Sequence, residues 1–194
     1  MSGRPKIFEE EVVIAKAAEL FWRKGFEAAS TEELLAAMGI GKGSFYLAFK
    51  GGKSELFEKV IEGVSRKELH LLNHTLATSQ NKVETLKDLF RSIGLAPKER
   101  NQKGCFFGQT IAEFSSTDLP FTDLAARHLL QLEKIFYEVI SEAQQDGMLS
   151  TKEAPALLAA HLITIWNGLG ISRRIAPQPN SLSTLIEMQL KVLQ

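Results

Sequence analysis

The stretch that most constrains the fold is residues 31–56, where two short helical segments are joined by a turn containing glycine. The first segment ends at Met38, and the second runs from Lys42 to Phe49. Gly39 suits the turn between them because left-handed backbone costs glycine little. Two short helices joined in this way form a helix-turn-helix. The sequence therefore predicts a helix-turn-helix near the N-terminus.

The second of these segments has two different faces. Phe45, Ala48 and Phe49 are three or four residues apart, which places them on one apolar stripe of a helix. At about 100° per residue, Gly43 and Leu47 point the opposite way. Small, hydroxyl-bearing and outward-pointing side chains make up that face and its flanks: Gly43, Ser44, Tyr46 and Leu47.

Lysines border this outward face. Lys42, Lys50 and Lys53 surround it, and no acidic residue lies between the first and the last of them. Such a face suits a DNA groove, because glycine permits close approach, hydroxyls bond phosphates or base edges, and lysines replace counterions. An ordinary surface helix is the alternative interpretation, since helix-turn-helix geometry also occurs in proteins that bind no DNA.

Further motifs lie around this stretch in a fixed order. They are G-R-P near the N-terminus, F-W-R-K-G-F-E at the end of the first helix, K-G-S-F-Y, and G-K-S-E-L-F at the start of the fourth helix. Together they resemble the N-terminal domain of the TetR family of bacterial transcriptional repressors. The later G-C-F-F-G and E-A-Q-Q-D-G-M-L runs are similar to the ligand domain of one TetR subgroup. The resemblance implies a homodimeric, all-helical regulator that releases DNA when a small ligand enters its C-terminal domain.

The DNA-binding candidates follow from the helix faces and from the resemblance. They are Arg4, Lys6, Thr31, Lys42, Gly43, Ser44, Tyr46, Leu47, Lys50 and Lys53. The resemblance implies that the arm carrying Arg4 and Lys6 enters a minor groove next to the recognition helix. A solvated, disordered start is the alternative for these first residues.

Apolar periodicity predicts an all-α chain of about nine helices. We expect a helix-turn-helix DNA-binding domain over residues 1–52 and a helical ligand-binding and dimerisation domain over residues 53–194. The expected helices span about 9–24, 31–38, 42–49, 53–79, 82–95, part of 104–116, 118–146 with Asp118 as its cap, 152–173 and 182–193. The polar segment 96–104 is predicted to be a loop.

Charge and composition limit the function. The net charge is zero and the pI is about 6.9, so the chain lacks the overall basic character of many nucleic-acid binders and depends on a local patch. Cys105 is the single cysteine, which excludes an internal disulfide and fits a reducing cytoplasm. Neither a secretory signal nor a membrane span of about twenty apolar residues is expected.

No catalytic role is expected. The chain lacks G-x-S-x-G, H-E-x-x-H and a phosphate-binding glycine loop. His70 and His74 are four residues apart, but without a third ligand motif nearby we expect no metal and no cofactor. A helical ligand carrier is the alternative function, although it leaves the K-G-S-F-Y face without a purpose.

The effector candidates are aromatic and isolated polar residues of the middle helices. They are Phe106, Phe107, Gln109, Thr110, Glu113, Phe136, Tyr137, His161, Trp166 and Asn167. This mixture suits a mostly apolar small molecule, and each residue also fits the core or an interface. Glu113 and His161 either orient the ligand or pair with each other. Cys105 is either a redox sensor or a small buried hydrophobe.

The last two helices carry more apolar surface than one buried face requires. This surplus predicts a helical-bundle interface between two copies of the chain, with completion of the monomer core as the alternative. The interface candidates are Leu158, Leu162, Ile165, Leu169, Leu182, Leu185, Ile186 and Gln189.

Overall fold

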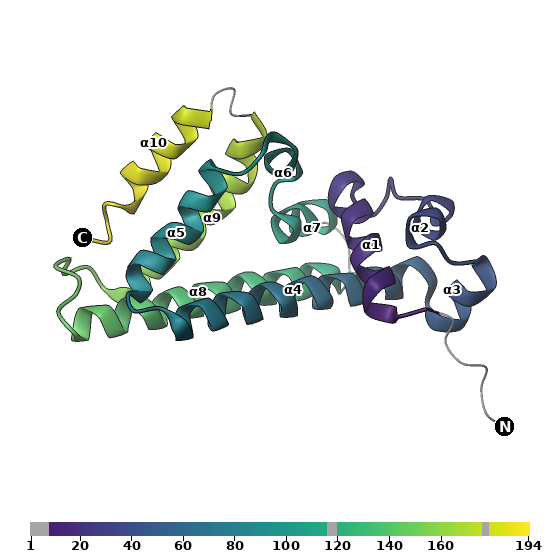
Figure 1. The fold of residues 1–194 in the computed structure, drawn as a ribbon, viewed down its shortest axis with the longest axis horizontal. Coiled ribbons are helices and arrows are strands. Elements are labelled where there is room, and N and C mark those ends of the chain that lie inside the picture. Colours follow the sequence, from purple (N-terminus) through teal and green to yellow (C-terminus); the bar gives the residue numbers. More distant parts are fainter. Residues whose placement is uncertain (1–7, 116–119, 176–178) are drawn as a thin grey trace. The chain divides into compact units, whose positions relative to one another are not determined.

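The computed structural model describes residues 8–115, 120–175 and 179–194, and these residues form helices joined by short turns (Figure 1). The helices are α1 (Glu10–Lys24), α2 (Thr31–Met38), α3 (Lys42–Ala48), α4 (Gly52–Thr78), α5 (Lys82–Gly94), α6 (Lys98–Lys103), α7 (Phe106–Phe114), α8 (Phe121–Gln145), α9 (Pro155–Ile175) and α10 (Pro179–Leu190). The predicted all-α class is confirmed.

One helix lies where the sequence predicted a loop. Within segment 96–104, α6 forms six residues of helix, so the described residues contain ten helices rather than about nine. No residue of α6 is buried, and it therefore lacks the apolar periodicity from which the other helices were predicted. The side-chain amide of Asn101 donates to the carbonyl of Ala96 at 3.0 Å, and basic residues occupy the last turn, where they interact favourably with the helix dipole.

The other boundaries agree with expectation to within a few residues. Helix α8 begins at Phe121, and the predicted cap Asp118 lies outside the described residues. Helix α10 ends at Leu190, three residues before the expected end, yet Leu193 beyond it is buried. The chain after α10 therefore still contributes to the core.

The chain forms two compact units. The N-terminal unit comprises the described residues up to Glu68 together with those of Thr110–Ala125, and the C-terminal unit comprises Leu69–Gln109 and Ala126–Gln194. These units group residues by packing, so a short piece of the later chain joins the helix-turn-helix. The functional division at residue 52 stays a prediction.

An aromatic cluster forms the centre of the N-terminal unit. Phe57 on α4 lies 4.8 Å from Phe21 on α1, 5.0 Å from Phe26 in the loop after α1, and 5.0 Å from Phe121 at the start of α8, measured between ring centroids. Phe114 at the end of α7 lies 5.4 Å from Phe26. Aromatic pairs at these separations each add about 0.5–1.5 kcal/mol beyond area burial. The cluster therefore joins segments distant in sequence.

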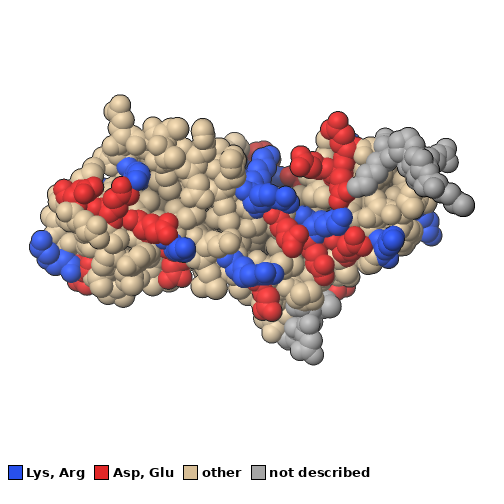
Figure 2. Space-filling model, turned by 90° about the horizontal axis from the view of Figure 1, so that it is seen from below, with Lys and Arg blue, Asp and Glu red and all other residues tan. Residues whose placement is uncertain are grey.

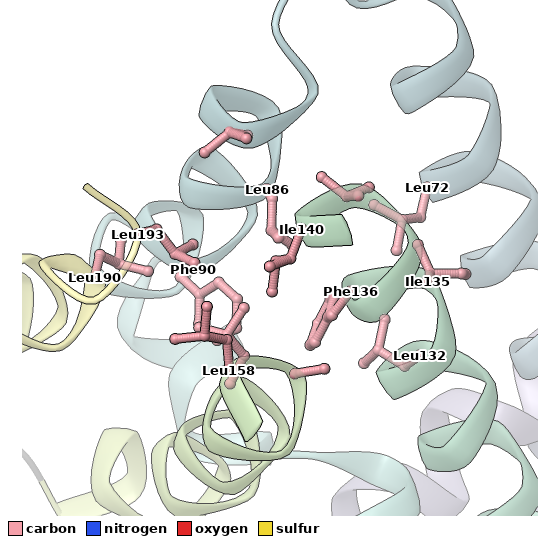
Figure 3. Packing of buried hydrophobic residues seen from close by; sticks show 14 of the residues in the cluster. Leu72, Leu86, Phe90, Leu132, Ile135, Phe136, Ile140, Leu158, Leu190 and Leu193 are labelled. Carbon is pink, nitrogen blue, oxygen red and sulfur yellow. The ribbon is translucent and has the colours of Figure 1, made fainter. Parts of the chain in front are cut away.

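The C-terminal unit has a largely aliphatic core that also contains aromatic rings (Figure 3). Helix α5 packs against both α9 and α10. Phe90 on α5 is fully buried, with its ring centroid 5.7 Å from that of Phe136 on α8 and 5.8 Å from that of Trp166 on α9. The core continues through α4, α9 and α10 with Leu72, Leu158 and Leu190.

Truncation of Phe57 should strongly destabilise the N-terminal unit. Phe57→Ala removes a buried ring that contacts four others, which typically costs about 3–5 kcal/mol. We expect a lower urea midpoint by circular dichroism. Leu95→Ala is the control, because Leu95 is 79% exposed and such a change alters stability by about 0.5 kcal/mol or less. Equal midpoints for the two variants would contradict the role of the cluster.

Candidate nucleic-acid interface

A reciprocal cap fixes the start of α2. The Ser30 hydroxyl accepts a hydrogen bond from the Glu33 amide, and the Glu33 carboxylate accepts one from the Ser30 amide, both at 3.2 Å. The ammonium of Lys24 also donates to Glu33 and lowers the pKa of that carboxyl. Thr31, a DNA-binding candidate, is the first residue of the helix and is half-buried.

The turn between α2 and α3 depends on one glycine. Gly39 has φ 72° and ψ 33°, and its amide donates to the Leu35 carbonyl at 2.9 Å. A side chain at this position would meet no other atom, so the left-handed backbone alone favours glycine. The predicted glycine turn is confirmed.

Helix α3 has the two faces that its sequence predicts. Phe45 and Phe49 are fully buried, with ring centroids 5.3 Å apart. On the opposite side Leu47 is 72% exposed and Tyr46 is 46% exposed, while a Cβ atom added at Gly43 would meet open space. The buried rings therefore fix which side of α3 faces outward. Ser44 lies between the two faces and is half-buried.

The three flanking lysines are not equivalent. Lys42 and Lys50 are exposed. The ammonium of Lys53 instead lies 4.3 Å from the centroid of the Phe26 ring and donates to the Glu27 carbonyl at 3.4 Å. Lys53 therefore helps to hold the loop between α1 and α2. Arg4 and Lys6 lie outside the described residues.

Basic side chains form no single dominant stripe on the face of the protein drawn in Figure 2. Lysine and arginine side chains lie among aspartate and glutamate side chains there, as the zero net charge leads one to expect. Acidic and basic residues also pair, as in the 2.7 Å contact between Lys59 and Glu10. A DNA-binding surface on this protein is therefore local.

The effector candidates separate by burial and by unit. Phe106, Phe107, Thr110 and Phe136 are buried, Gln109, Glu113, His161 and Trp166 are half-buried, and Tyr137 and Asn167 are exposed. Thr110 and Glu113 belong to the N-terminal unit, and the others belong to the C-terminal unit. The candidates are therefore divided between the two units.

Ring contacts bring some of these candidates together through two residues that are not among the candidates. Phe136 and Trp166 both pack on Phe90, as described above. Phe107 stacks on His128 with ring centroids 3.5 Å apart. Neither Phe90 nor His128 differs in sequence pattern from an ordinary helix residue, so only the packing identifies them.

Two polar candidates on α7 already have partners within the chain. Glu113 accepts hydrogen bonds from the backbone amides of Phe26 and Glu27, so the predicted alternative of pairing with His161 is wrong. Gln109 accepts one from the guanidinium of Arg174 at 2.6 Å. By contrast, Nε2 of His161 is buried without a hydrogen-bond partner among the described residues.

Two shallow hollows lie on the described surface. The first is lined by Val12, Ala15, Lys16, Glu19 and Ala37, and the second by Leu130, Glu133, Lys134, Tyr137, Ala156 and Ala159. Tyr137 is the one effector candidate that lines either of them. The buried candidates pack against neighbouring side chains instead.

The structure corrects much of the predicted dimer interface. Leu158, Leu162, Leu169, Leu182 and Ile186 are buried in the core of the C-terminal unit, so they are not surface residues. Ile165 and Gln189 are half-buried, and Leu185 is 38% exposed. The error arose because an apolar stripe alone does not tell whether its own chain or a partner covers it.

A different face of α9 is apolar and exposed. Leu157, Ile171 and Ile175 are 60%, 68% and 76% exposed. By length and composition α9 could cross a membrane, since an 18-residue window has a mean hydropathy of 1.3. Core helices meet the same criterion, and α9 supplies three leucines to the core. Only 28% of the window is buried, however, so much apolar surface remains uncovered.

The fold and the outward face of α3 define a class of protein, the helix-turn-helix DNA-binding regulators with an additional helical unit. Comparison with known proteins narrows this class. Residues 13–60 match the family model described as bacterial regulatory proteins of the tetR family, and residues 83–188 match that of the tetracyclin repressor-like C-terminal domain. The chain belongs to the TetR family.

Individual relatives agree with this assignment. The repressor ComR of Escherichia coli K12 is 30% identical over 176 residues, which cover 89% of this chain and 82% of ComR. The repressor DhaR of Mycobacterium sp. GP1 is 27% identical over 187 residues, covering 92% and 90% of the two chains. The chain is therefore an HTH-type transcriptional regulator and not an enzyme.

Solved structures share the fold. A TetR regulator from Rhodobacter sphaeroides aligns with a TM-score of 0.83 at 22% identity, over 95% of this chain and 98% of that one. A cysteine variant of the TetR-family regulator CifR, solved with 26-base-pair operator DNA, aligns with a TM-score of 0.81 at 23% identity, over 98% and 100% of the chains. These likenesses extend over both units.

His128 should make stability depend on pH. Burial lowers the pKa of His128 to about 4 from an ordinary value near 6.5, so the folded protein holds the neutral ring. Between these values the unfolded chain binds more protons, and stability therefore falls as pH falls from about 6.5 toward 4. We expect His128 to make the free energy of unfolding, measured in urea, about 2 kcal/mol lower at pH 5 than at pH 7.

His128→Gln is the test variant, and His74→Gln is its control because His74 is exposed. The difference in stability between pH 7 and pH 5 should shrink for the first variant and persist for the second. An unchanged difference in His128→Gln would show that another group causes the pH dependence.

Proposed function

We propose that the protein is a ligand-responsive transcriptional repressor that binds a pseudo-palindromic operator as a homodimer in the cytoplasm. A small, mostly apolar molecule releases it from DNA. The observation that carries the proposal is the geometry of α3, whose buried phenylalanines turn an open face outward between two exposed lysines. A helical ligand carrier would have no use for this face.

Recognition of DNA rests on the exposed residues of α3. Tyr46 and Leu47 are exposed, and Gly43 lets the helix backbone approach the base edges closely. Lys42 and Lys50 contact phosphates on either side and position the helix without reading sequence.

Residues outside this face add hydrogen bonds and charge to the interface. They are Ser44, Thr31, and Arg4 and Lys6 of the N-terminal arm. Lys53 acts mainly within the protein.

The exposed apolar face of α9 supports the homodimer. Leu157, Gly168, Ile171 and Ile175 are exposed, and this side of the helix carries no charge among them. A second copy placed on this face by a two-fold axis would cover the same residues on both chains. Leu130 and Tyr137 on α8 are also exposed. Stable interfaces bury roughly 1,200–2,000 Å² in total.

The effector belongs in the C-terminal unit near His161 and Trp166. The buried Nε2 atom of His161 lacks a partner, and a ligand that donates or accepts a hydrogen bond would satisfy it. The aromatic rings of Phe136 and Trp166 suit a mostly apolar molecule. Because these rings are packed around Phe90, entry of a ligand must displace side chains, which couples binding to a change of conformation.

The direct test is selection of bound fragments from the source genome, followed by a salt titration on any enriched fragment. We expect a pseudo-palindromic sequence whose affinity falls linearly with the logarithm of salt concentration. Absence of enrichment from a folded dimer, both alone and with cell extract added, would reject the proposed function.

Two substitutions on α3 test its role. Leu47→Glu places a carboxylate against the DNA, and Tyr46→Ala removes a projecting ring, so each should lower affinity for the selected fragment by roughly 100-fold in fluorescence anisotropy. Both residues are exposed, so circular dichroism should show the wild-type melting temperature. Leu95→Glu is the matched control, because Leu95 is also exposed but lies outside α3, and this variant should keep the wild-type affinity. Full affinity in both α3 variants would remove α3 from the interface.

A charge on α9 tests the dimer. Ile171→Glu would bury two carboxylates in the proposed interface, an unfavourable arrangement. Wild-type protein should sediment at twice the 21.5 kDa chain mass, and the variant should sediment as a monomer at micromolar concentration. Leu95→Glu should remain dimeric. A dimeric Ile171→Glu variant would place the interface elsewhere.

A further inference from the structure

The carboxylate of Glu113 binds two consecutive backbone amides after α1. Oε2 accepts a hydrogen bond from the Phe26 amide at 3.1 Å, and Oε1 accepts one from the Glu27 amide at 2.9 Å. More than eighty residues separate the partners in sequence. Both belong to the N-terminal unit, because Thr110–Ala125 packs with it.

The backbone at this point is shaped for the carboxylate. The Gly25 amide donates to the Phe21 carbonyl at 2.7 Å and ends α1, so the next two amides have no partner within the helix. Gly25 has φ 81°, and a Cβ atom there would lie 3.0 Å from Oε2 of Glu113. Glycine therefore both turns the chain and leaves space for the carboxylate.

The same loop is held on its other sides. The Phe26 ring is buried in the aromatic cluster, and Lys53 contacts both this ring and the Glu27 carbonyl. Three residues after Glu27, the cap at Ser30 starts α2. The position of this loop therefore determines where α2 begins, and α3 follows α2 after a tight turn.

Glu113 also shares its helix with a second polar anchor. Gln109 precedes it by four residues, which places both side chains on one face of α7. Gln109 accepts a hydrogen bond from Arg174 of α9, and Arg174 also donates to the Lys103 carbonyl at 2.5 Å. A shift of α7 along its own axis would therefore strain the two hydrogen bonds at Glu113.

We propose that Glu113 is a positioning residue for DNA binding, which holds the loop before α2 in the geometry that α3 needs on the operator. The inference rests on the proposed function. Movement of α7 withdraws the carboxylate, frees the Phe26 and Glu27 amides and lowers operator affinity. Glu113 thus acts through the helix-turn-helix and contacts neither DNA nor effector.

Glu113→Gln tests this role. The glutamine amide group has one oxygen acceptor and a nitrogen that only donates, so at least one backbone amide loses its partner. We expect faster hydrogen exchange at Phe26 and Glu27, and roughly 10-fold weaker binding to the fragment selected with wild-type protein. The salt slope should not change, because the number of phosphate contacts stays the same. Glu99→Gln on α6 is the matched control, since Glu99 is exposed.

Glu113→Asp provides a second variant if Glu113→Gln fails to fold. It keeps the charge but shortens the side chain by one methylene, so exchange should again rise at the two amides. If hydrogen exchange at Phe26 and Glu27 is unchanged in the folded variant, the two hydrogen bonds to Glu113 do not protect these amides. If exchange is faster but operator affinity is unchanged, Glu113 has no positioning role. If wild-type protein selects no DNA, the proposed function fails and the positioning role fails with it, whatever exchange shows at the two amides.

Discussion

The aromatic cluster around Phe57 is the packing on which the N-terminal unit depends. It joins α1, the loop after α1, α4, the end of α7 and the start of α8 through ring contacts of about 5 Å. Because the later chain supplies Phe114 and Phe121, the helix-turn-helix is completed by residues outside its own segment.

This packing gives α3 a fixed orientation. Phe45 and Phe49 point into the unit, so Tyr46 and Leu47 must point out of it. The Phe26 and Glu27 amides of the loop after α1 donate hydrogen bonds to Glu113 on α7, and the ammonium of Lys53 on α4 lies over the Phe26 ring. The orientation of α3 therefore depends on contacts that other helices make with its unit.

Local sequence patterns predicted much of this architecture. The glycine turn at Gly39 and the two faces of α3 follow from backbone preference and helical period, and both were confirmed. Helix α6 was missed because it is polar on every side, and the buried leucines of α9 were assigned to the wrong surface. The bonds of Glu113 could not be predicted, since they join residues more than eighty positions apart without a local pattern.

The proposed function requires two copies of α3, related by a two-fold axis, to bind one operator. Hydroxyl-radical footprinting on a selected fragment tests it most directly. We expect two protected patches on one face of the duplex, with centres about 34–36 Å apart or a whole multiple of that distance. A single protected patch, or diffuse protection along the fragment, would contradict it.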